Sequence, residues 1–126
     1  FKEEGFIYTL KPGTYTGQEL DEFLFDRKKG FCEHYAGAYG TLARALGIPA
    51  RVVVGYQGGR YNPWGDFWMV SQKDAHAWVE LFYDGQWIRK DPTQWVAPLR
   101  FEIGAEDFFA LSPEQQIQFA KNLEWK

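Results

Sequence analysis

The chain has 126 residues, of which 45% are hydrophobic and 19% aromatic, and its formal net charge is −3. This length suits one domain with a sizeable core, and the acidic balance argues against the basic surface that binds nucleic acid. No stretch approaches the roughly 18–20 apolar residues that a membrane-spanning helix needs.

The first part of the chain predicts an extended, turn-rich start followed by two helices. Thr16 with Glu19 three residues later forms a capping box, which predicts a helix that ends at Gly30. A second helix is expected over residues 32–46, ended by Gly47. The inner positions of this second helix are alanines and glycines, so other elements can approach it closely.

The middle of the chain predicts strands. Extended segments are expected at residues 50–59 (a buried strand), 67–71, 76–83 and 86–93, with a loop at residues 60–66. The last two segments flank Asp84-Gly85 and therefore predict a β-hairpin. Farther on, Ser112, Pro113 and Gln115 predict the start of a C-terminal helix over residues 113–124. Helices first and an antiparallel sheet after indicate the α+β class.

Cys32 is the only cysteine, so no intramolecular disulfide is expected. It lies at the predicted start of the second helix, where unpaired N–H groups and the helix dipole lower the pKa of a thiol. The Cys32 backbone N–H there is also a natural donor to an oxyanion. His34 lies about 200° around the helix from Cys32, which makes it a poor base. We expect His34 at the rim of a cleft.

The predicted hairpin supplies a better base. With a two-residue turn at Asp84-Gly85, residue 83 faces residue 86 and Trp78 faces Asp91. His76 lies on the same side of the sheet as Trp78, so Asp91 is its diagonal neighbour, within hydrogen-bonding reach. A three-residue turn would aim Asp91 the other way. Together with Cys32 these residues form a candidate nucleophile–base–orienter triad.

The residues by themselves leave two other interpretations of Cys32 open. A lone cysteine is often a small buried hydrophobe without chemistry. Cys32, His34, His76 and Asp91 also contain the donor types of a zinc site, but Cys32 and His34 diverge on a helix, whereas structural zinc sites usually take close-spaced pairs. We therefore expect no metal.

Three segments together resemble the transglutaminase-like superfamily: GFCEHYAGAYGTLARALGIPARVVVGYQGG, DAHAWVELF and WIRKDPT. The similarity is greatest to the domain carried by bacterial multi-spanning membrane proteins, and it runs from about Tyr8 to Phe101. It implies a papain-like α+β core with the cysteine at the N-terminus of a central helix packed on an antiparallel sheet. Carried over by position, Cys32 is the nucleophile, His76 the base and Asp91 the third member.

The resemblance implies acyl transfer from a glutamine or peptide carboxamide, through a thioester, to an amine such as lysine. Two alternatives remain: a peptidase or amidase that uses water with the same triad, and a catalytically idle peptide-binding module. Animal transglutaminases use an upstream tryptophan as a second oxyanion donor. This chain has no tryptophan before Cys32, which leaves Tyr8 or Tyr15 as candidates. Without a carboxylate cluster we expect no calcium, and no cofactor.

Several aromatic residues are candidates for the wall of a substrate cleft, with ordinary packing as the alternative. The substrate-binding candidates are Tyr56, Trp64, Trp68, Trp78 and His34. Trp78 is the best of them, because it shares a face with His76 and can shield the imidazole from water. Glu80 is expected to pair with Arg51 or Arg89.

We expect residues 1–126 to form one domain, with a core over about residues 8–101, and to be an excised part of a longer protein. The chain begins at Phe1 and its only methionine is Met69. By resemblance, the parent protein is anchored in a bacterial membrane and this part is a soluble, extracytoplasmic domain.

Overall fold

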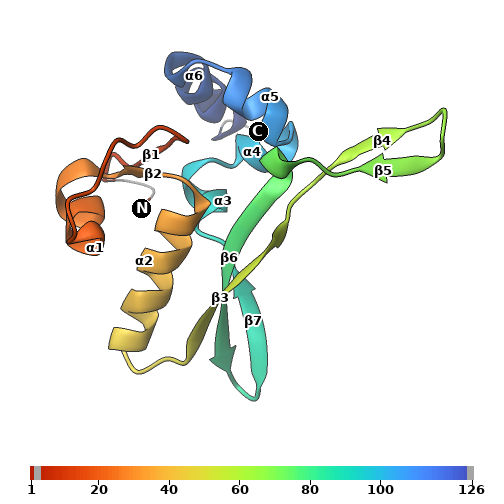
Figure 1. The fold of residues 1–126 in the computed structure, drawn as a ribbon. Coiled ribbons are helices and arrows are strands. Elements are labelled where there is room, and N and C mark those ends of the chain that lie inside the picture. Colours follow the sequence, from red (N-terminus) through yellow and green to blue (C-terminus); the bar gives the residue numbers. More distant parts are fainter. Residues whose placement is uncertain (2–3, 125–126) are drawn as a thin grey trace.

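One long helix packed across a three-stranded antiparallel sheet organises the chain (Figure 1). The computed structural model describes residue 1 and residues 4–124, with side chains described as far as residue 118. The helix is α2 (Cys32–Ala45), and the sheet has the order β3 (Ala50–Tyr56), β6 (Ala75–Tyr83), β7 (Gln86–Lys90). Helix α2 contacts β6 most extensively and β3 next. The fold class is α+β, as predicted.

Smaller elements surround this centre. Before α2 come β1 (Ile7–Tyr8), α1 (Glu19–Asp21), the π-helical η1 (Glu22–Arg27) and β2 (Lys29–Gly30). Between β3 and β6 lie β4 (Arg60–Asn62), β5 (Phe67–Met69) and the 3₁₀ turn η2 (Gln72–Asp74). After β7 follow α3 (Thr93–Val96), α4 (Leu99–Glu102), α5 (Ala105–Ala110) and α6 (Pro113–Glu124). Strands β1 and β2 pair in parallel, and β4 and β5 form an arm that projects from the body (Figure 1).

The β6–β7 hairpin has the predicted register. Tyr83 pairs with Gln86 and Val79 pairs with Lys90. Asp84 and Gly85 occupy the two turn positions with φ of 51° and 78°. Positive φ at both central residues defines a type I′ turn, whose twist matches that of the two strands. The turn therefore aligns the two strands so that the residue after β7 lies beside the first residues of β6.

Several local predictions were wrong. The first helical segment begins at Glu19 rather than after Thr16, whose side chain contacts Glu22 instead of capping the helix. It ends at Arg27 rather than at Gly30, which pairs in β2. The last extended segment stops at Lys90 rather than at residue 93, because α3 begins at Thr93. Residues 60–66 are not wholly a loop, because residues 60–62 pair with β5. Strand β3 is not buried: Val54 is 76% exposed, because β3 is an edge strand and α2 covers only one face of the sheet.

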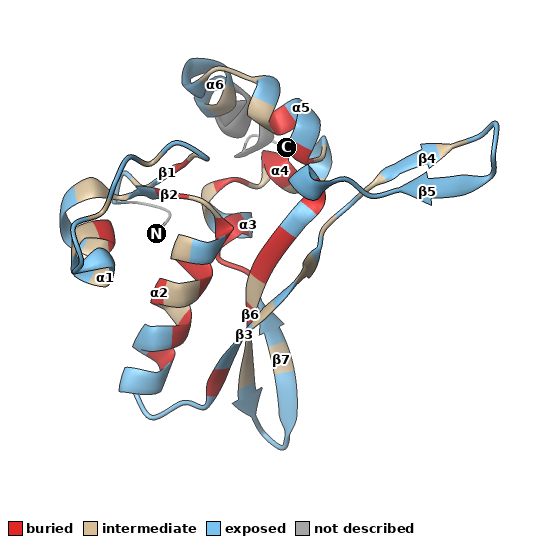
Figure 2. Ribbon diagram, in the orientation of Figure 1, coloured by how far each residue is buried: buried red, intermediate tan, exposed pale blue. Residues whose placement is uncertain are grey.

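Part of the high aromatic content forms the core, whereas many other aromatic side chains of the described residues are exposed. Tyr35, fully buried on α2, contacts the rings of Phe1, Phe6, Tyr8 and Phe23. Buried residues follow the inner face of α2 and the adjoining part of β6 (Figure 2). Phe108 on α5 packs edge-on against Tyr8, which ties the C-terminal helices to the N-terminal segment. None of the helices in the described part of the chain is both long enough and apolar enough to cross a membrane.

Candidate active site

Cys32 is the first residue of α2, and it is a buried residue that lines a cleft. Its backbone N–H donates a hydrogen bond to the Tyr8 hydroxyl oxygen at 3.2 Å. The preceding glycine of the G-x-C motif has a steric role: a Cβ at Gly30 would lie 2.6 Å from the Cβ and Cγ atoms of His34. No real Cβ contact is that short, so only glycine lets the chain turn into α2 with His34 in this position.

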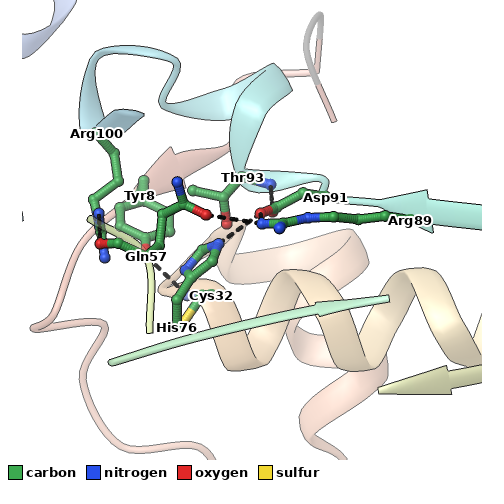
Figure 3. Close-up of polar contacts among 8 residues, drawn as sticks. All are labelled: Tyr8, Cys32, Gln57, His76, Arg89, Asp91, Thr93 and Arg100. Atoms are coloured by element: carbon green, nitrogen blue, oxygen red, sulfur yellow. Dashed lines mark hydrogen bonds and ion pairs between the residues drawn. The ribbon is translucent and has the colours of Figure 1, made fainter. Parts of the chain in front are cut away.

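His76 and Asp91 form the pair that the hairpin register predicts. His76 Nε2 lies 2.6 Å from Asp91 Oδ2, and the two side chains are 0% and 2% exposed (Figure 3). His76 is the second residue of β6, and Asp91 directly follows the last residue of β7. Because Nε2 faces a carboxylate oxygen, it carries a proton and the other ring nitrogen, Nδ1, is left for the thiol. Nδ1 is buried and has no hydrogen-bond partner of normal geometry among the described residues.

The carboxylate of Asp91 is itself held by two further groups. Its Oδ1 accepts a hydrogen bond from the Thr93 backbone N–H at 3.0 Å, and Arg89 Nη2 lies 3.5 Å from Oδ2 (Figure 3). Arg89 also donates to the side chain of Gln57 at 2.8 Å. The D-P-T motif thus folds back on its own aspartate, in the way of an Asx turn. This arrangement fixes which oxygen of Asp91 faces His76.

The thiol and the imidazole shift one another's pKa in opposite directions. Burial alone raises the pKa of Cys32, but His76, the Ala77 backbone and the Tyr8 hydroxyl together lower it below its ordinary value. Burial alone lowers the pKa of His76, but Asp91 and Cys32 outweigh it and raise the pKa. Both shifts favour the thiolate–imidazolium form near neutral pH. A charged, nucleophilic sulfur is what acyl transfer requires.

Two aromatic rings cover the imidazole. Trp78 stacks against His76 with ring centres 6.1 Å apart, and Phe101 meets it edge-on at 5.6 Å. The Arg89 guanidinium lies 4.4 Å above the Trp78 ring. A Cβ at Gly55 would come within 2.9 Å of the Trp78 ring, so the glycine of the G-Y motif makes room for it. Trp78 therefore lies against the imidazole, as the sequence suggested, but it is absent from the wall of the cleft that Cys32 lines.

The other candidate cleft residues lie elsewhere. A cleft of about 390 Å³ adjoins the triad, and its wall includes Tyr8, Phe31, Cys32, Val54, Lys73 and His76. Trp64 and Trp68 are instead on the β4–β5 arm, 98% and 69% exposed, because that hairpin extends away from the body (Figure 1). Tyr56 ends β3 and is 57% exposed, outside the cleft wall.

His34 was expected at the cleft rim and is not there. Its Nδ1 accepts a hydrogen bond from the Phe31 backbone N–H at 3.2 Å, and its ring lines a different pocket, together with Glu19 and Phe23. The helical twist turns it away from Cys32, as the sequence argument held. Glu80 pairs with Arg51 at 2.9 Å.

Sequence reasoning missed three residues around the site. Thr93 and Arg89 hold Asp91, and the D-P-T motif was the available signal for Thr93. Arg100, on α4, is 1% exposed beside Tyr8 and Gln57 (Figure 3), and its Nε and Nη2 have no hydrogen-bond partner among the described residues. No local pattern marks Arg100, since only the packing of α4 against the body buries it.

A sequence model of the transglutaminase-like superfamily matches residues 3–92, a range that includes Cys32, His76 and Asp91. The chain belongs to this superfamily. The match covers α2 and the β3–β6–β7 sheet, the elements that bring the three side chains together.

Among individual proteins, the chain is 54% identical over 111 residues to the protein-glutamine gamma-glutamyltransferase of Pseudomonas aeruginosa, covering 87% of this chain and 17% of that protein. It is 40% identical over 80 residues to the uncharacterised protein YebA of Bacillus subtilis, covering 60% and 11%. The chain thus spans less than a fifth of the length of these curated relatives.

Solved structures show the same fold. The crystal structure of the periplasmic domain of TgpA from Pseudomonas aeruginosa superposes with a TM-score of 0.81 at 53% identity, covering 84% of this chain and 37% of that chain. The same domain bound to ethylmercury gives a TM-score of 0.77 at 55% identity, covering 80% and 37%.

Proposed function

We propose that this domain is a cysteine acyltransferase of the transglutaminase type. Cys32 is the nucleophile, His76 the general base and then the general acid, and Asp91 the group that orients His76. The observation that carries the proposal is the buried 2.6 Å contact between His76 and Asp91, which leaves the opposite ring nitrogen for the thiol. The family and the name of the Pseudomonas aeruginosa relative support it.

The reaction starts from the thiolate–imidazolium pair. The Cys32 sulfur adds to the carbonyl carbon of a glutamine side-chain amide, and the carbonyl oxygen becomes an oxyanion near the Cys32 backbone N–H. His76 then gives its proton to the amide nitrogen, the C–N bond breaks, and ammonia leaves the thioester behind. A primary amine attacks the thioester carbon while His76 takes a proton from it, and the thiolate leaves. The product is a new amide.

The triad is compatible with water in place of the amine, which would make the domain an amidase or peptidase. Incubation with a glutamine-containing peptide, with and without a fluorescent primary amine, separates the two reactions. Label incorporated into the peptide supports transfer. Release of ammonia or peptide cleavage without incorporated label would show that water is the acceptor and refute transfer. The absence of any product, with an unreactive Cys32, would favour an idle binding module.

The pH dependence of Cys32 alkylation tests the triad without a substrate. The lowered pKa of Cys32 and the raised pKa of His76 both favour the ion pair over the neutral pair. We therefore expect iodoacetamide to react rapidly at mildly acidic pH, where an ordinary thiol with a pKa of about 8.5 is mostly protonated. His76→Ala should remove this reactivity, and His34→Ala should leave it. The reverse result would refute the assignment of His76 as the base.

The location of the domain follows by similarity. The matched crystal structures are of a periplasmic domain. We therefore propose that this domain works outside the cytoplasm of a bacterium, on protein or peptide amides and amines, as part of a larger membrane-anchored protein.

A further inference from the structure

We propose that the Tyr8 hydroxyl is the second oxyanion donor of this site. The inference rests on the proposed acyl-transfer function, because an oxyanion forms only when a carbonyl carbon is attacked. Tyr8 is the last residue of β1, far from Cys32 in the sequence, and the pairing of β1 with β2 brings it to the start of α2. Of the two tyrosines that the sequence offered, Tyr15 instead contacts the Lys29 carbonyl and is absent from the cleft wall.

The position of the Tyr8 oxygen is the first argument. It accepts the Cys32 backbone N–H at 3.2 Å. The oxyanion of a tetrahedral adduct on the Cys32 sulfur is expected about 2.7–3.1 Å from that same N–H. The hydroxyl thus lies at the same N–H group to which the oxyanion is expected to bind. A carbonyl oxygen that enters displaces the hydroxyl from the N–H and becomes the acceptor for both groups.

The surroundings keep this hydroxyl a neutral donor. Tyr8 is 5% exposed, and burial, together with the negative charge of Cys32, raises its pKa well above the ordinary value. It therefore stays protonated when the thiolate forms. Its ring stacks between those of Tyr35 and Phe109, with centres 5.9 and 5.8 Å away and interplanar angles of 26° and 18°. These near-parallel rings, together with the edge-on ring of Phe108, hold the plane of the Tyr8 ring.

The buried guanidinium group of Arg100 lies near Tyr8 (Figure 3). Among the described residues it donates only a long hydrogen bond of 3.4 Å, to the Gln57 carbonyl. No carboxylate of the described residues lies within ion-pair distance of it. Its charge lowers the pKa of Tyr8, against the larger effect of burial. The field of Arg100 therefore favours negative charge at the Tyr8 position, which is the charge that develops on the carbonyl oxygen.

The test compares a reaction that forms an oxyanion with one that does not. Hydrolysis of p-nitrophenyl acetate passes through a tetrahedral oxyanion, whereas alkylation by iodoacetamide displaces iodide at a saturated carbon. Both reactions are measured at alkaline pH, where the thiol is fully ionised whether or not the Tyr8 hydroxyl is there to lower its pKa. For Tyr8→Phe in the full chain we expect the ester acylation rate to fall on the order of 10²-fold, while the alkylation rate stays within about twofold of the wild type. Tyr35→Phe is the matched control, since it removes a buried hydroxyl, bonded to the Ile7 carbonyl at 2.7 Å, from the same aromatic cluster.

Each outcome decides the matter. An unchanged or faster ester reaction of Tyr8→Phe would mean that the hydroxyl only binds the Cys32 N–H, and it would overturn the proposal. An equal loss of both reactions would assign Tyr8 to the thiolate instead. A wild-type protein that is alkylated normally but never acylated by the ester also overturns it. Failure of the glutamine reaction, with the ester effect of Tyr8→Phe intact, would count against the proposed function alone.

Discussion

Replacement of Asp91 by asparagine is expected to abolish most of the activity without disturbing the fold. The Thr93 backbone N–H donates to Oδ1 of Asp91 at 3.0 Å, and it needs an oxygen there in the variant as well. Arg89 favours an oxygen at the Oδ2 position, which faces His76. Its contact there is longer, at 3.5 Å, and its side chain is 47% exposed. The buried backbone contact therefore decides the orientation, and the amide NH₂ faces His76.

This orientation changes the tautomer of the imidazole. Facing an NH₂ group, His76 Nε2 must accept a hydrogen bond, so the proton moves to Nδ1, the nitrogen that faces the thiol. A nitrogen that already carries a proton cannot take one from Cys32. The aspartate of a serine-protease triad has the same role, and its replacement by asparagine costs about 10⁴-fold in turnover.

The loss of the negative charge of Asp91 gives a second, independent estimate of the loss of turnover. A unit negative charge about 4 Å from the imidazolium is worth about 4 kcal/mol at an effective dielectric constant near 20, which is about 10³-fold in the population of the ion pair. Both arguments apply to a pair that is at most 2% exposed, where solvent screening is small. We therefore expect turnover to fall by about 10³- to 10⁴-fold.

The assay combines two readouts. Amine incorporation into a glutamine peptide measures turnover, and iodoacetamide alkylation across the pH range measures the thiolate. Asp91→Asn should lose both at mildly acidic pH. Asp74→Asn is the matched control, because Asp74 is also a buried carboxylate but bonds only the nearby Ser71 in the described structure. If Asp91→Asn kept turnover within about tenfold of the wild type, the tautomer argument would be refuted.

Two further predictions concern the support of the site. Arg89→Gln should lower turnover only about two- to fivefold, since half-exposed ion pairs are worth about 0.2–1 kcal/mol. Arg51→Gln is the control: it removes a comparable cation, 3.9 Å above the Trp87 ring, and should leave turnover unchanged. A larger loss in the second variant than in the first would contradict this. Gly37→Ala should stabilise α2 by about 1 kcal/mol, because nothing lies within 4 Å of the new Cβ. Gly30→Ala should instead lower the melting temperature measured by circular dichroism, because its Cβ would collide with His34. Equal melting temperatures for the two would refute the steric account of Gly30.

The sequence by itself determined the features that follow from short-range geometry. The small-residue helix over α2, the Asp84-Gly85 turn and the strand parity around it required no knowledge of the rest of the fold. They aligned Asp91 with His76 because side-chain direction alternates regularly along a strand and a two-residue turn allows one register. Local geometry also separated His34 from Cys32.

Only the tertiary structure decided which distant groups surround these residues. Tyr8 reaches Cys32 through the pairing of two-residue strands, which no local pattern predicts, and Arg100 becomes buried only when α4 packs against the body. Trp64 and Trp68 are of the residue type that often lines clefts, yet both are exposed to solvent because they lie on the β4–β5 hairpin. Contacts between segments distant in sequence depend on the summed packing of the whole domain, whereas the register of a hairpin depends on its turn.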